Sequence, residues 1–130
     1  MKNLLILTLI FITSYITGFS QEYISTKKGG DWYDAKTWKN GNIPDSNSNV
    51  VVSGNVVISE PIKCKNLKIS KHGIIEFKET QDSLIANISE VLIIDDGKIK
   101  IGDKWNIHVN EIKRLNDGKI ENLGTISVGM

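Results

Sequence analysis

The sequence VVVSGNVVIS, residues 50–59, places a glycine between two short apolar runs, and this arrangement decides the fold. It returns as NLKISKHGIIEF at residues 66–77, as VLIIDDGKIKIG at 91–102 and as a weaker copy around Gly118. The four glycines are 19, 24 and 21 residues apart and are Gly54, Gly73, Gly97 and Gly118. Such spacings are typical of solenoids, in which each repeat buries its apolar face only by stacking on the next.

The residues around the four glycines match position by position. Two residues after the glycine, all four copies carry an apolar side chain: Val56, Ile75, Ile99 and Ile120. Four residues after it stand Ile58, Phe77, Ile101 and Asn122, and four residues before it stand Val50, Ile69, Ile93 and Arg114. Alternation in steps of two predicts short strands with one buried face. The glycines are expected to be structural turn residues that take a positive φ at the corner between two strands.

The repeat therefore predicts an all-β protein, a short right-handed parallel β-helix of about four coils. Its coils are expected over residues 49–130, after an N-terminal cap segment at residues 21–48. An antiparallel β-sandwich is the alternative fold. Arg114 and Asn122 replace apolar residues in the last copy, where the apolar column would be ending. The strand edge left open there suggests a protein partner or self-association as one role of the C-terminal end.

Residues 1–20, MKNLLILTLIFITSYITGFS, are typical of a secretory signal peptide, with Lys2 ahead of an apolar run and small residues before the expected cleavage site. A secreted or cell-surface location follows, with no membrane span after cleavage. Loss of Lys2 leaves 16 − 1 = 15 basic residues against 15 acidic ones. That balance gives no basic patch for nucleic acid. Cys64 is the only cysteine, so no internal disulfide can form. Its side chain is predicted to be buried.

An aromatic segment, DWYDAKTWKNGNIP at residues 31–44, precedes the first repeat. In one interpretation Asp34 caps a helical turn that brings Trp38, together with Trp32, down onto the first coil as an end plug. In the other, Trp32 and Tyr33 are exposed and stack on sugar rings. The candidate ligand-binding residues are Trp32, Tyr33 and Trp38.

The pattern TW-x-x-G-x-x-P at residues 37–44, followed by the three glycine-centred stretches, resembles the G-eight domain and the front segments of large secreted, pectin-lyase-like β-helix proteins. The likeness runs from about Tyr23 to Ile101. It implies an extracellular module of surface proteins and of some proteins that handle polysaccharides such as hyaluronan. The positions that correspond are structural ones: Trp38, Gly41, Pro44, Gly54, Gly73 and Gly97. Family members often carry an aspartate just before the first valine strand, where this chain has Asn47, Ser48 and Asn49.

These features predict a non-enzymatic secreted module for adhesion, surface structure or polysaccharide binding. The alternative is the N-terminal fragment of a polysaccharide-degrading β-helix enzyme. It depends on Asp96 and Asp117, which precede corner glycines and would stack about 4.8 Å apart, close to the carboxyl separation of retaining glycosidases. No catalytic residue is predicted, because Lys98 and Lys119 would neutralise this pair. No cofactor is expected, and no metal, since Asp95, Asp96, Asn116 and Asp117 supply only part of a calcium shell.

Overall fold

The computed structural model describes residues 22–129, so the predicted signal peptide lies outside the described residues. The described chain is all-β, with one short 3-10 helix, η1, at Ala35–Thr37. Among these residues no helix is long and apolar enough to cross a membrane. The strands are β1 Glu22–Ile24, β2 Gly30–Asp31, β3 Asn49–Val52, β4 Asn55–Ile58, β5 Ile62–Cys64, β6 Asn66–Ile69, β7 Ile74–Phe77, β8 Leu84–Asp95, β9 Lys98–Ile101, β10 Trp105–Leu115, β11 Lys119–Asn122 and β12 Thr125–Val128.

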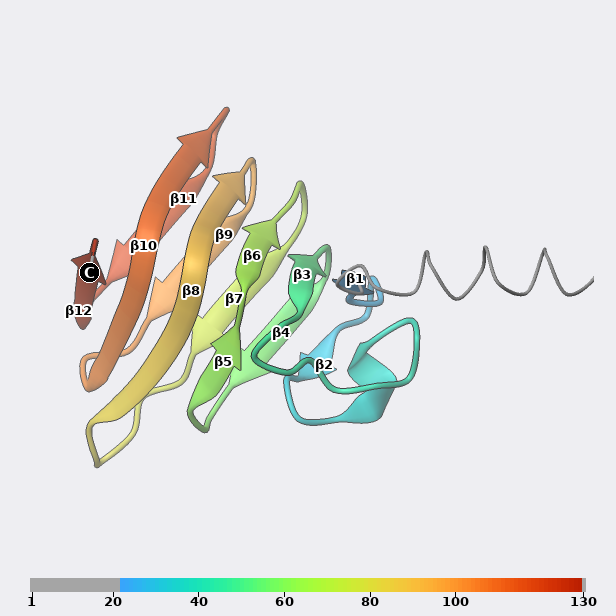
Figure 1. The fold of residues 1–130 in the computed structure, drawn as a ribbon, viewed down its shortest axis with the longest axis horizontal. Coiled ribbons are helices and arrows are strands. Elements are labelled where there is room, and N and C mark those ends of the chain that lie inside the picture. The colour runs from blue at the N-terminus through green and yellow to red at the C-terminus, as the bar shows by residue number, and fades with distance from the viewer. Residues whose placement is uncertain (1–21, 130) are drawn as a thin grey trace, which may run out of the picture.

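The strands form two sheets that face each other in a β-solenoid of about four turns. Sheet A has the order β1-β3-β6-β8-β10-β12, with β5 also pairing with β8, and sheet C has the order β11-β9-β7-β4-β2. Figure 1 shows the strands stacked from β1 at one end to β12 at the other. All pairings between the strands of residues 22–129 are parallel, so the solenoid prediction is confirmed and the antiparallel sandwich is wrong.

The core is a set of apolar columns between the two sheets. In sheet C, Val56 lies beside Ile75 and Ile75 beside Ile99, and all three are buried. Ile120 extends this column, as the sequence predicts. Stacking thus buries a continuous apolar face that no single turn could bury alone. The neighbouring column ends at Asn122, which is exposed beside the buried Ile101.

The register predicted on the other side of the glycines is wrong. Val50 pairs with Leu67 rather than with Ile69, and Ile94, not Ile93, lies inward beside Ile69. Counting back from the glycine fails because the corners differ in length. Between the last inward residue of the sheet A strand and the glycine there is one residue in the first copy (Ser53), three in the second (Ser70, Lys71 and His72) and two in the third (Asp95 and Asp96).

The corner glycines are required for close approach of the coils and not for a positive φ. None of the four has a positive φ; that conformation is taken by His72 and Asp96, directly before two of the glycines, and by Asn116, two residues before Gly118, with φ of 68°, 58° and 54°. A Cβ on Gly73 would lie 2.2 Å from the Val52 carbonyl oxygen. The glycines therefore let one corner lie directly against the backbone of the coil before it.

The N-terminal segment does more than the predicted cap at residues 21–48. Strand β1 pairs with β3, and β2 pairs with β4, so the segment supplies a short first turn to both sheets. Beyond β2 the backbone N–H of Trp32 donates to Val57 O at 2.9 Å, which continues the same register. The rest of the segment then folds across the end of the solenoid, where Lys39 N donates to Ile24 O at 2.9 Å.

Candidate functional site

Two of the three candidate aromatic residues are buried in the N-terminal end of the solenoid. Trp32 is 1% exposed and Trp38 is 2% exposed. Their rings meet edge to face, with centroids 5.1 Å apart, and Trp38 Nε1 donates to Trp32 O at 2.9 Å. Since protein covers both indoles, a sugar ring cannot stack on either one. The prediction of Trp32 and Trp38 as ligand-binding residues is wrong, and the end-plug interpretation describes both.

The plug is built by the helical turn that the sequence predicts. Asp34 is the N-cap of η1, where its Oδ1 accepts from Lys36 N at 2.9 Å. The turn reverses the chain, so that Trp38 N bonds Ala35 O at 3.2 Å and the Trp38 ring returns to Trp32. Short polar side chains at N-cap positions satisfy backbone donors in this way.

Tyr33 is the one candidate that stays accessible. It follows the inward Trp32 and is 42% exposed. The Tyr33 hydroxyl donates to the Pro61 carbonyl oxygen, and the Tyr33 N–H donates to Asp31 Oδ1 at 2.8 Å. Partial burial, with smaller contributions from Glu60 and Asp31, raises the pKa of Tyr33 above its ordinary 10.0. The hydroxyl is therefore protonated at neutral pH, and its hydrogen bond to Pro61 O holds the ring against the next coil.

A groove of about 510 Å³ opens beside Tyr33. The Tyr33 ring, two prolines and an isoleucine that is 44% exposed give it an apolar surface, and carboxylate, hydroxyl, amide and ammonium groups border it. Aromatic and apolar area with a few polar groups is the usual composition of a small-ligand site. We call it the Tyr33 groove; its lining residues are Tyr33, Pro44, Asp45, Ser46, Pro61, Ile62, Lys63, Ile85 and Asn87.

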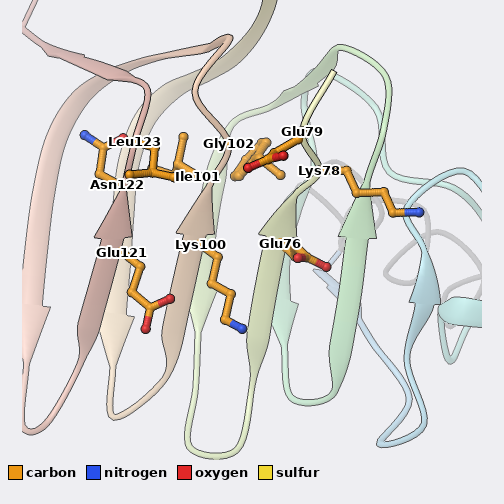
Figure 2. Close-up of a pocket in the computed structure, with 10 residues that line it drawn as sticks. Glu76, Lys78, Glu79, Lys100, Ile101, Gly102, Glu121, Asn122 and Leu123 are labelled. Atoms are coloured by element: carbon orange, nitrogen blue, oxygen red, sulfur yellow. The ribbon is translucent and has the colours of Figure 1, made fainter. Parts of the chain in front are cut away.

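A larger hollow lies elsewhere, on the outer side of sheet C, with a volume of about 690 Å³. Figure 2 shows Glu76, Lys100 and Glu121 in a row on three neighbouring strands below Leu123. These charges are balanced within the protein: Lys98 Nζ lies 2.7 Å from Glu121 Oε1, and this hydrogen bond lowers the pKa of Glu121. The only aromatic residue in the lining, Phe77, is 1% exposed, so this hollow has no ring on which a sugar could stack.

The predicted stacking of Asp96 on Asp117 is not formed as a simple register pair. Leu115 lies beside Asp95 and Lys119 beside Lys98, so three residues of the last corner face two of the corner before it. Both aspartates do line one groove of about 450 Å³, whose other lining residues are Lys71, His72, Gly73, Ile74, Gly97, Lys98 and Lys119. Among residues 22–129, no three acidic, histidine or cysteine side chains are grouped to hold a metal ion.

Cys64 is buried, as the alternation around it predicts. Burial raises the pKa of the Cys64 thiol to about 12. The protonated thiol is a poor nucleophile, and this side chain is a small apolar part of the core.

Comparison with known families adds one assignment. The family model of the G8 domain matches residues 37–118, which is more than half of the chain. The chain belongs to the G8 domain family. The match begins at Thr37, next to the plug residue Trp38, and ends at Gly118, so it contains all four corner glycines of this G8 domain. No curated protein and no solved structure matches the chain.

The matched segment differs from the predicted likeness, which ran from Tyr23 to Ile101. Tyr33 lies four residues before the match, whereas Pro44, Pro61 and Ile85 lie within it. The Tyr33 groove of this G8 domain therefore joins a residue from outside the matched segment to the end of the N-terminal segment and to two coils inside the match. The sequence shows Tyr33 as a candidate but gives no sign of its partners, because the coils that carry them meet only in the folded solenoid.

Proposed function

We propose that this G8 domain is a secreted, non-enzymatic module that binds a polysaccharide in the Tyr33 groove. The observation that carries the proposal is Tyr33, which is 42% exposed and whose hydroxyl ties the ring to Pro61 O. A ring fixed in this way loses little conformational entropy when a ligand covers it. The signal-peptide features of residues 1–20 support an extracellular location, where polysaccharides are abundant.

The lining of the groove matches the two kinds of surface that a sugar has. The C–H face of a pyranose ring is apolar and packs against aromatic and proline rings, here Tyr33 and Pro61. Sugar hydroxyls both donate and accept, and the groove offers the Asp45 carboxylate, the Ser46 hydroxyl and the Asn87 amide. The groove thus combines stacking area with polar groups that fix the orientation of a sugar.

The experiment is affinity measurement on purified residues 21–130 against a panel of neutral and acidic soluble polysaccharides. We expect saturable binding to at least one of them, weakened about tenfold or more in Tyr33→Ala. Leu115→Ala is the matched control, because Leu115 is 45% exposed but is not among the residues that line the groove. Binding that is unchanged in Tyr33→Ala, or no binding to any polysaccharide, would contradict the proposal.

A second candidate function is polysaccharide cleavage, as part of a larger β-helix enzyme. It is favoured by one observation, that Asp96, Asp117 and His72 line the same groove. Two carboxyl groups near an imidazole are suitable for acid-base chemistry. Release of new reducing ends from any panel polysaccharide, lost in Asp96→Asn, would favour this function; intact polysaccharide after long incubation would exclude it for residues 21–130.

A further inference from the structure

The outer face of sheet A has two halves that differ in how their polar side chains are bonded. On the half nearer the corner glycines, these side chains bond one another. Asn66 Nδ2 donates to Asn49 Oδ1 at 2.9 Å, and Asn66 Oδ1 accepts from Val91 N at 3.0 Å. Lys68 Nζ lies 3.9 Å from Asp95 Oδ2. This half is therefore satisfied largely within the protein.

The other half, formed by β5, the first parts of β8 and β10, and β12, carries two straight rows of outward side chains. In the first row Lys63 lies beside Asn87, Asn87 beside His108, and His108 beside Ser127. In the second, Ile85 lies beside Asn106, and Asn106 beside Thr125. We call these the outer rows; their residues are Lys63, Asn87, His108, Ser127, Ile85, Asn106 and Thr125.

The polar groups of the outer rows are left for a partner. Asn87, Asn106 and His108 are half-buried, yet within residues 22–129 their side chains form no hydrogen bond or ion pair. Their polar atoms reach the surface, so they are accessible to a ligand that offers matching donors and acceptors. The contrast with the bonded half of the same sheet indicates a surface suited to hydrogen-bond a ligand.

The outer rows begin at the Tyr33 groove, because Lys63, Ile85 and Asn87 belong to both. From there they run across the strands, along the axis of the solenoid. Successive strands of a sheet are about 4.8 Å apart, which is close to the length of one sugar ring in an extended chain. Lys63 is the only residue of the outer rows with a fixed charge, and the Asp45 carboxylate lines the same groove and offsets it. With no net positive charge, the surface matches hydroxyl or amide groups better than carboxylates or sulfates.

We infer, on the basis of the proposed function, that the ligand is an extended neutral polysaccharide. It lies with one ring on Tyr33 and the following rings along the outer rows, across β8 and β10 to β12. Three strand steps of about 4.8 Å cover about 14 Å, so the surface holds about four sugar units in all. Single sugars and disaccharides reach only the Tyr33 groove.

The test is calorimetric binding of two neutral probes, oligosaccharides of cellulose and of chitin, each from one to six units long. The variant is Asn106→Ala with His108→Ala, both on the outward side of β10. Lys113→Ala is the matched control, since Lys113 is on the same strand and the same face but beyond the outer rows. Circular dichroism and melting temperature check that each variant folds.

For wild type and Lys113→Ala, affinity should rise with length and level off at about four units. The double variant should bind the longer oligomers about tenfold more weakly, with disaccharide binding unchanged. Binding that depends on Tyr33 but not on length or on the double variant would overturn the inference and leave the proposed function standing. An acidic polysaccharide as the only ligand would do the same, and no binding in either experiment would overturn both.

Discussion

Replacing Trp38 with alanine should largely open the N-terminal end of the solenoid. The side chain is 2% exposed, so almost all of its area leaves the core. Truncation of a buried tryptophan costs about 3–5 kcal/mol. The change also removes the edge-to-face contact with Trp32 and leaves Trp32 O without its donor at 2.9 Å. We expect a loss of about 4 kcal/mol, a large part of the roughly 5–15 kcal/mol that holds a domain of this size together.

Urea unfolding followed by circular dichroism measures this loss, with an accompanying fall in melting temperature of about 15 °C. Trp38→Phe is the first control: it keeps a ring but loses the Nε1 donor, and should cost about 1–2 kcal/mol. Tyr33→Ala is the second, expected below about 1 kcal/mol because Tyr33 is exposed. A loss in Trp38→Ala as small as that in Tyr33→Ala would refute the end-plug account.

Two further predictions concern the coils. Gly73→Ala places a Cβ 2.2 Å from Val52 O and should lower the free energy of unfolding by more than about 3 kcal/mol. Gly41 has a φ of +73° but no atom within 4 Å of the added Cβ, so Gly41→Ala should lower it by only about 1–2 kcal/mol. Equal urea midpoints for the two variants would contradict the close-approach argument. The Cys64 thiol should not react with a thiol reagent in the folded protein at pH 8. Rapid labelling of the folded protein would be inconsistent with burial. Because folding raises the pKa of the thiol from 9.0 to about 12, its contribution to the free energy of unfolding should be complete below pH 9 and decrease as the pH rises toward 12. Cys64→Ala should lack this decrease.

The sequence predicts the architecture well because the apolar residues that recur in each repeat are the ones that stack into the buried columns. Val56, Ile75 and Ile99 recur at one distance after a glycine, and stacked coils are the arrangement that buries all three. It does not predict the register before the glycine, where corners of one to three residues change the count. Nor does the sequence show why glycine is needed at the corners, because the close contact of Gly73 with Val52 O is formed between two coils and only in the folded protein.

The site is predicted in part, for a related reason. The aromatic segment is easily recognised in the sequence, but Trp32 and Trp38 are buried whereas Tyr33 is exposed. Alternation along an irregular segment cannot predict which of the three side chains are buried. Two of the partners of Tyr33, Pro61 and Ile85, come from residues 28 or more positions later. The outer rows could not be predicted from the sequence, because only the strand register places His108 beside Asn87 and no shared motif links the two residues.

The most direct test of polysaccharide binding at Tyr33 is a pair of amide NMR spectra of residues 21–130, recorded without and with the polysaccharide that binds best in the panel. The account predicts shift changes concentrated at Tyr33, Lys63 and Asn87, and spreading to β10. Changes confined to the Glu76–Lys100–Glu121 hollow of sheet C or to the Asp96–Asp117 groove would contradict it.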